Sequence, residues 1–161
     1  MYEKLLDLTG FIAAHAVWSV SDLDDGGLIP LMAYESASGR QLERWIGGEQ
    51  APKQRFADWL KEDQGKTSAA VCVFDGYITL DDLPRSDCLF VEAAGQGGLR
   101  LSLGIPYRPA KAGFAVFRPK VLSIDGVSPE MIPTLMEQFW KGVDAHEQAA
   151  AVWNAALDQS K

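Results

Sequence analysis

The sequence has few of the side chains from which recognisable catalytic and metal sites are built. Its 161 residues include only two histidines, His15 and His146, and two cysteines, Cys72 and Cys88. They form neither an H-E-x-x-H pair nor the clustered spacing of a zinc site, and no Gly-x-Ser-x-Gly nucleophile motif occurs. The sequence therefore predicts no catalytic residue, no metal and no cofactor, and it favours a non-catalytic protein over an enzyme.

A long apolar segment is also missing. The uncharged stretch from Leu8 to Ser21 is shorter than the roughly 20 residues that a membrane-spanning helix needs. Glu3 and Asp7 stand where a secretory signal would carry basic residues. A chain of this size folds without a disulfide, so we expect both cysteines to be reduced and packed as small hydrophobic residues. These features predict a cytoplasmic protein that does not bind membranes, and the composition resembles that of a small acidic bacterial protein.

The overall composition excludes a disordered chain. Hydrophobic residues make up 47% of the sequence and charged residues 23%, which are ordinary values for globular domains. No internal repeat, low-complexity tract or linker divides the chain, and its length suits one buried core. We expect a single globular domain over residues 1–161.

Charge is distributed unevenly along the chain. The net charge of −7 argues against nucleic-acid binding, because that affinity comes mainly from neutralising phosphates. Acidic residues are absent from residues 93–124, whereas the basic residues of this segment are Arg100, Arg108, Lys111, Arg118 and Lys120.

Apolar residues at helical spacing predict a helix near each end of the chain. Residues 2–20 are expected to form a largely buried helix. In the C-terminal segment, the apolar register includes Ile132, Met136, Phe139, Val143, His146, Ala150, Trp153 and Leu157. This register favours one long helix; the alternative is a break at Gly142, with Asp144 as a new N-cap. A shorter amphipathic helix is expected from Pro52 to about Asp63.

The middle of the chain has the features of β-strands. Strand-like segments cover residues 28–35, 69–74, 77–80, 87–94, 99–103 and 114–124. Asp75-Gly76 is typical of a two-residue hairpin turn, with a bulge inside one longer strand as the alternative. Residues 40–46 are ambiguous and are compatible with a helical turn. The fold class predicted is α+β: an antiparallel meander of about five strands packed against the N-terminal helix and a long C-terminal helix.

Two loops resemble ligand sites weakly. The acidic loop at residues 22–27 carries oxygen ligands of the kind that calcium prefers, but it lacks the regular alternation of an EF-hand and is interpreted as a solvated turn. Residues 95–98 are rich in glycine, yet an alternating strand follows them where a phosphate-binding loop would open a helix. A hairpin turn is the better interpretation.

The two histidines allow two interpretations. Both lie on apolar helical stripes, where a half-buried imidazole commonly bonds a carbonyl or a carboxylate for purely structural reasons. The functional alternative brings His15 and His146 together, so that they share a metal or one of them acts as a base. Proximity of the two rings in space would favour this alternative.

The basic segment supports a binding hypothesis. If residue i pairs with residue 222 − i across a turn at Lys111, then Arg100, Arg118 and Lys120 share one face of the sheet, with Arg108 at the rim. This face would bind an acidic protein partner or a small anion. The structural alternative is that these side chains neutralise the carboxylates of the same chain.

The leading functional hypothesis is therefore a non-catalytic protein-binding domain, such as an adaptor, a chaperone-like factor or a toxin-neutralising partner, that uses the basic sheet face. The alternative is a small enzyme or ligand-binding protein with a site assembled around His15 and His146. A homodimer formed through the C-terminal helix is a third hypothesis.

Overall fold

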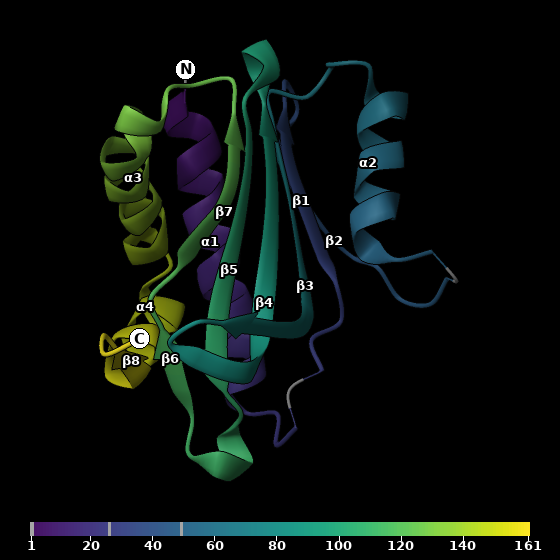
Figure 1. Ribbon diagram of the computed structural model, residues 1–161. Coiled ribbons are helices and arrows are strands. Elements are labelled where there is room, and N and C mark those ends of the chain that lie inside the picture. Colours follow the sequence, from purple (N-terminus) through teal and green to yellow (C-terminus); the bar gives the residue numbers. More distant parts are fainter. Residues whose placement is uncertain (1, 26, 49) are drawn as a thin grey trace.

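A computed structural model describes residues 2–25, 27–48 and 50–161, so Met1, Gly26 (within the acidic loop considered above) and Glu49 lie outside the described residues. The helices are α1 (Tyr2–Ser21), α2 (Pro52–Asp63), α3 (Ile132–Ala145) and α4 (Glu147–Ala156), with short 3₁₀ turns at Gln96–Gly98, Ala110–Ala112 and Pro129–Met131. The strands are β1 (Leu31–Ser36), β2 (Gly39–Arg44), β3 (Ala69–Leu80), β4 (Leu83–Gly95), β5 (Arg100–Arg108), β6 (Ala115–Phe117), β7 (Lys120–Asp125) and β8 (Leu157–Asp158). Figure 1 shows their arrangement.

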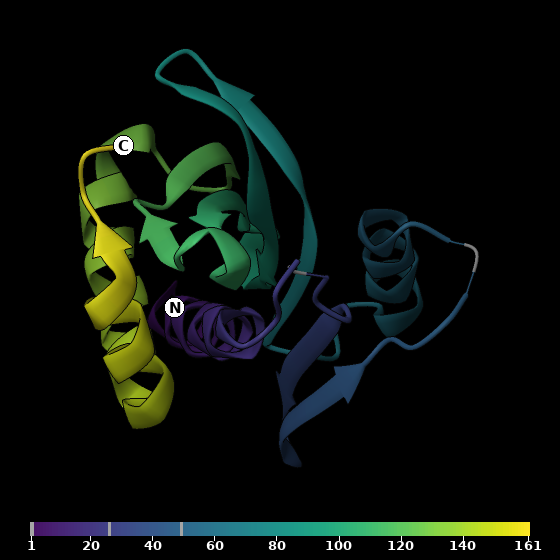
Figure 2. The same ribbon diagram turned by 90° about the horizontal axis from the view of Figure 1, so that it is seen from below.

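The strands form one mixed sheet with the order β2-β1-β3-β4-β5-β6-β8, and β7 pairs with β5 beside β6. All neighbours are antiparallel except β6 and β8, which run parallel. The sheet curves around α1, while α2 lies on the opposite side of the sheet (Figure 2). The predicted α+β class is thus confirmed. The predicted meander of about five antiparallel strands is wrong, because the sheet is larger and mixed, and β3 pairs with β1 instead of β2.

Helix α1 is the centre of the main hydrophobic core. Its Leu5, Leu8 and Ile12 are buried, as the apolar spacing predicts, and they pack with inward residues of β3, β4 and β5. Alternate residues of β3 face opposite cores: Val71 joins the α1 side, whereas Cys72 joins a smaller core beneath α2. None of the helices among the described residues is both long and apolar enough to cross a membrane.

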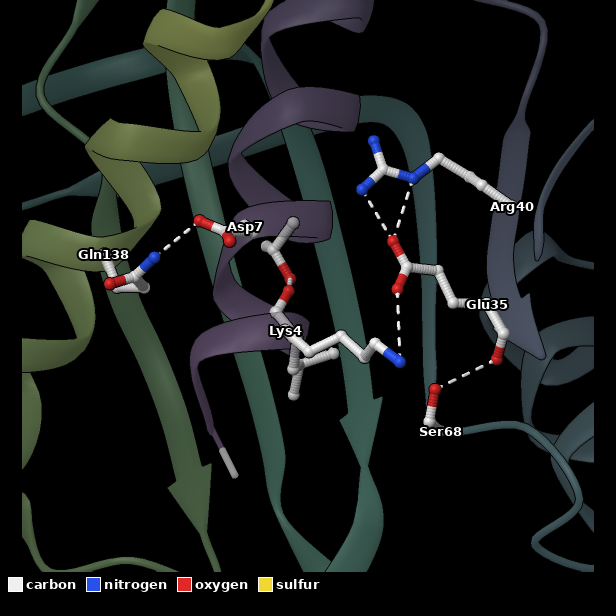
Figure 3. Close-up of polar contacts among 8 residues, drawn as sticks. Lys4, Asp7, Glu35, Arg40, Ser68 and Gln138 are labelled. Carbon is white, nitrogen blue, oxygen red and sulfur yellow. Dashed lines mark hydrogen bonds and ion pairs between the residues drawn. The ribbon is translucent and has the colours of Figure 1, made fainter. Parts of the chain in front are cut away.

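Two glycines allow α3 to run unusually close to α1. A Cβ on Gly10 would overlap the carbonyl oxygen of Phe139 and lie 2.8 Å from the backbone nitrogen of Val143. A Cβ on Gly142 would overlap the carbonyl oxygen of Asp7 and lie 2.9 Å from its Cα. In addition, Gln138 donates a hydrogen bond of 2.5 Å to Asp7 (Figure 3). The two helices run side by side in the same direction, and their contact has almost no space for additional atoms.

The single long C-terminal helix predicted by the apolar register is wrong. The helix is interrupted at His146, whose backbone has φ −96° and ψ 83°, so α3 and α4 are separate. The alternative break at Gly142 is also misplaced, because Gly142 serves the contact with α1 and Asp144 is still helical. The side chain of His146 accepts from the backbone N–H of Ala149, so the histidine itself caps α4.

Two further local expectations need correction. Asp75-Gly76 forms no hairpin turn: β3 continues through it as one longer strand, which was the alternative, but the register irregularity lies between Ile78 and Leu80 and the chain reverses after Leu80. The carboxylate of Asp75 instead accepts from the backbone of Gly27 and Leu28 and from the hydroxyl of Tyr107. Asp75 therefore ties the segment after α1 to the sheet. The ambiguous segment at residues 40–46 contains no helical turn, because residues 39–44 form the edge strand β2.

We expect Gly10→Ala to destabilise the protein. In an exposed helix this change stabilises by about 1 kcal/mol through helix propensity, but here the new methyl group meets the Phe139 carbonyl. Overpacking of this kind costs roughly 1–3 kcal/mol. Urea unfolding measures the change, and a variant as stable as the parent protein or more stable would show that α1 and α3 are not in such close contact.

Candidate functional site

The structure brings the two histidines into direct contact. His15 lies on α1 and His146 at the junction of α3 and α4, and 3.1 Å separates Nδ1 of His15 from Nε2 of His146. Both side chains are half-buried. The contact follows from the α1–α3 packing and from the helix break, which together place the junction beside the middle of α1.

Aromatic rings surround the pair. The ring of His146 lies 4.7 Å from that of Phe11 and 5.4 Å from that of His15, measured between centroids, and Trp18 meets it edge-on at 5.4 Å. Phe11, His15 and Trp18 occupy one face of α1, at intervals of four and three residues. The imidazoles are therefore held by packing on several sides.

Two arginines of β2 approach this cluster. Nη2 of Arg44 lies 3.4 Å from Nε2 of His15, and the guanidinium of Arg40 lies over the ring of Phe11 at 5.0 Å. We define the His–Arg cluster as His15, His146, Arg44 and Arg40 with the rings of Phe11 and Trp18. It combines residues from α1, β2 and the α3–α4 junction.

The cluster has one more N–H donor than it has hydrogen-bonding contacts to use. Three contacts link Arg44 to His15, His15 to His146, and His146 to the backbone N–H of Ala149. Each contact uses one hydrogen, but Arg44, Ala149 and two neutral imidazoles supply four. Because the Ala149 N–H donates to Nδ1 of His146, that ring donates through Nε2 to Nδ1 of His15. His15 then carries its own hydrogen on Nε2, and this N–H faces the N–H of Arg44.

The surplus donor lies at the exposed end of the cluster, since Arg44 is exposed. An acceptor placed between Arg44 and Nε2 of His15 would receive a hydrogen bond from each. Protonation of either imidazole would add a further hydrogen and increase the mismatch. In agreement, the pKa of His15 is lowered from its ordinary value, chiefly by burial and then by the nearby positive charges of His146 and Arg44.

The cluster contains two side chains that can ligate a metal ion, His15 and His146, beside the cations Arg40 and Arg44. Among residues 2–25, 27–48 and 50–161, no three side chains of His, Cys, Asp and Glu gather in a way that would hold one. The two cysteines are free and buried elsewhere, Cys72 in β3 and Cys88 in β4. Burial raises the pKa of both thiols to about 12, so neither is an ionised nucleophile.

The basic residues do not have the pairing assumed from the sequence. Gly104 pairs with Lys120 and Arg100 with Asp125, so the 222 − i register is wrong. A bulge in β7 and the short strand β6 displace the pairs. By strand alternation, Arg100 and Lys120 still share the face of the sheet opposite α1, and Arg108 lies on the same side. Asp125 directly opposes Arg100 on that face.

Several of these side chains already bind backbone carbonyls. Arg100 donates to the carbonyls of Gly95 and Leu99, and Arg108 donates to that of Gly113. Arg118 precedes β7 and donates to the carbonyl of Lys161. Arg118 lines a cleft of about 580 Å³ together with residues of α3 and α4. This cleft is separate from the sheet face predicted to bind a partner. Whether these residues bind a partner stays a prediction.

Sequence reasoning missed both arginines of β2. Arg40 and Arg44 lie in a segment of undecided structure, and their relation to α1 is a long-range contact. The alternation of Arg40, Leu42 and Arg44 was the available signal, because alternate residues of a strand share a face.

No protein-family model, no curated protein and no solved structure matches the chain.

We expect NMR titration to give His15 a pKa below the ordinary value near 6.5. His146→Gln removes a neighbouring charge and should raise that pKa part of the way back, since burial remains. Arg100→Gln removes a cation of β5, which is not part of the His–Arg cluster. It is the control and should leave the pKa of His15 unchanged. Because the unfolded chain binds this proton at higher pH, the contribution to stability is lost as pH falls below about 6.5. A pKa at or above the ordinary value in the parent protein would contradict this.

Proposed function

We propose that this protein is a binding protein that recognises a carboxylate, or a similar anionic group, of its partner at the His–Arg cluster. The supporting observation is the chain of three contacts from Arg44 through His15 and His146 to the Ala149 N–H, from which a surplus N–H at the contact between His15 and Arg44 follows. The proposal keeps the acidic partner expected from the sequence and moves its binding site from the basic sheet face to α1 and β2.

A carboxylate fits the chemistry of this position. It is an acceptor with two oxygens, so one oxygen binds the N–H of Arg44 and the other the Nε2–H of His15. Its negative charge also offsets the positive charge of Arg44, which has no ion-pair partner within the described part of the chain. The imidazole donor is held in place before binding, because Phe11 and Trp18 pack against the two histidine rings.

We expect propionate, which carries the carboxylate of a glutamate side chain, to shift the ¹⁵N resonance of His15 Nε2 at constant ionic strength. Arg44→Gln should weaken this binding at least tenfold, since a hydrogen bond to a charged group contributes roughly 1.5–3 kcal/mol. Affinity should rise as pH falls through the pKa of His15, because an anion favours the protonated ring.

Two controls accompany the propionate titration. Propionamide has the same shape without the charge and should not bind, and Arg100→Gln should bind propionate as the parent protein does. Unchanged affinity in Arg44→Gln, or no response of His15 to propionate, would contradict the proposal.

The sheet face is a second candidate, favoured by the observation that Arg100 and Lys120 share it. Once a protein partner is known, Arg100→Glu with Lys120→Glu should weaken its binding if this face is used. Arg118→Glu lies in the separate cleft and serves as the control. Equal affinity of the double variant and the parent protein would remove this face from consideration.

Association through the C-terminal helix is less well supported. Phe139, Val143 and Trp153, on the apolar stripe that suggested a homodimer, are buried in the core of the same chain. Sedimentation velocity tests the homodimer directly.

A further inference from the structure

We infer that β2 binds an extended acidic segment of a partner protein as an additional strand. This inference rests on the proposed function, because it takes the carboxylate bound by His15 and Arg44 to belong to that segment. It adds the kind of partner and the geometry of binding, which the His–Arg cluster alone does not define.

Strand β2 is the end of the sheet. It pairs only with β1, and all six of its residues are exposed. An edge strand of this kind presents backbone N–H and C=O groups to which another strand can bind. Helix α2 lies on the other side of the sheet and leaves this edge uncovered (Figure 2).

The pairing with β1 determines which backbone groups point outward. The N–H of Trp45 donates to the carbonyl of Pro30, so these two residues form a hydrogen-bonded pair. In an antiparallel ladder such pairs alternate with pairs that share no hydrogen bond, and Leu31 opposite Arg44 is the next. Continuing along β2, the backbone groups of Arg44, Leu42 and Arg40 point away from β1, toward the free edge.

The same three residues direct their side chains toward α1. Arg40 lies over Phe11 and Arg44 beside His15, and Leu42 shares their face by strand alternation. Leu42 is a large hydrophobic residue that is 49% exposed, so its side chain has apolar surface available to a partner. A strand added here would therefore meet two cations with an apolar residue between them.

The charges near this edge favour an acidic segment. Glu35 accepts from Arg40 and also forms an ion pair with Lys4 at 3.9 Å, as Figure 3 shows. Asp7, farther along α1, is bound by Gln138. One carboxylate thus serves both Lys4 and Arg40, while Arg44 keeps its charge unpaired within the described residues. At the face of β1 and β2 that points toward α1, the positive charges of Lys4, Arg40 and Arg44 exceed the single negative charge of Glu35, while Glu43 of β2 lies on the opposite face by strand alternation.

These positions define the pattern of the partner. Side chains of the added strand that face α1 recur at every second residue and lie beside Arg40, Leu42 and Arg44. The complementary pattern is acidic, any, apolar, any, acidic. In some proteins, charged residues on an edge strand serve only to prevent strand pairing. Binding of an acidic peptide to β2 separates that role from strand addition.

The test measures binding of the capped peptide Thr-Glu-Thr-Val-Thr-Glu-Thr to the full chain. Calorimetry gives the affinity, and the shift of the His15 ¹⁵N resonance shows whether the peptide reaches the His–Arg cluster. Two N-methylated versions each block one alternating set of peptide amides. Since only one set faces β2 in an added strand, one version should lose at least tenfold in affinity and the other should bind as the parent peptide does.

A variant of the protein tests the same contact from the other side. Leu42→Pro removes an outward N–H that β1 does not use, a position at which an edge strand tolerates proline. Leu42→Ala keeps the N–H and loses the same apolar contact, so it is the matched control. Leu42→Pro should bind the peptide at least tenfold more weakly than Leu42→Ala.

Each result has a distinct meaning. If both N-methylated peptides bind like the parent peptide, strand addition is wrong and the carboxylate site stands. If propionate binds and the peptide does not, the extended partner is likewise wrong. If neither propionate nor the peptide shifts His15, the proposed function fails, and this inference fails with it.

Discussion

The close contact between α1 and α3 determines how the rest of this structure is arranged. Gly10 and Gly142 let the two backbones approach to a distance that any side chain at these positions would prevent. With α3 against one side of α1 and the curved sheet against the other, α1 becomes the centre of the core. The face of α1 that carries Phe11, His15 and Trp18 is then only half-buried, between β2 and the α3–α4 junction.

The helix break converts this packing into a site. If α3 and α4 formed one straight helix, His146 would be a helical residue on the apolar stripe; instead it caps α4 and its ring lies against His15. Its Nδ1 is occupied by the Ala149 N–H, which determines where the hydrogens of both imidazoles lie. The unpaired donor at Arg44 is therefore a consequence of how α4 begins. Local backbone geometry in one helix determines what the opposite end of the cluster can bind.

The sequence was sufficient for features that depend on local periodicity. The buried helix α1, the helix α2 and the α+β class all follow from the spacing of apolar residues such as Leu5, Leu8 and Ile12. It was insufficient where long-range contacts override local preference. Asp75-Gly76 continues a strand because Asp75 bonds Tyr107 and the segment after α1, and Gly142 marks a helix contact instead of a helix end. The meeting of His15 and His146, and the approach of Arg44, depend on tertiary packing that no spacing encodes.

The most direct test is the ¹⁵N–¹⁵N coupling through the hydrogen bond between the two histidines, measured together with the position of the hydrogen on each ring. We expect a coupling between Nδ1 of His15 and Nε2 of His146, with each ring protonated at Nε2. That result would leave His15 and Arg44 as two donors facing one another. If the coupling is absent, or if His15 carries its hydrogen on Nδ1 and accepts from Arg44, then no surplus donor exists at this position and the proposed carboxylate site is contradicted.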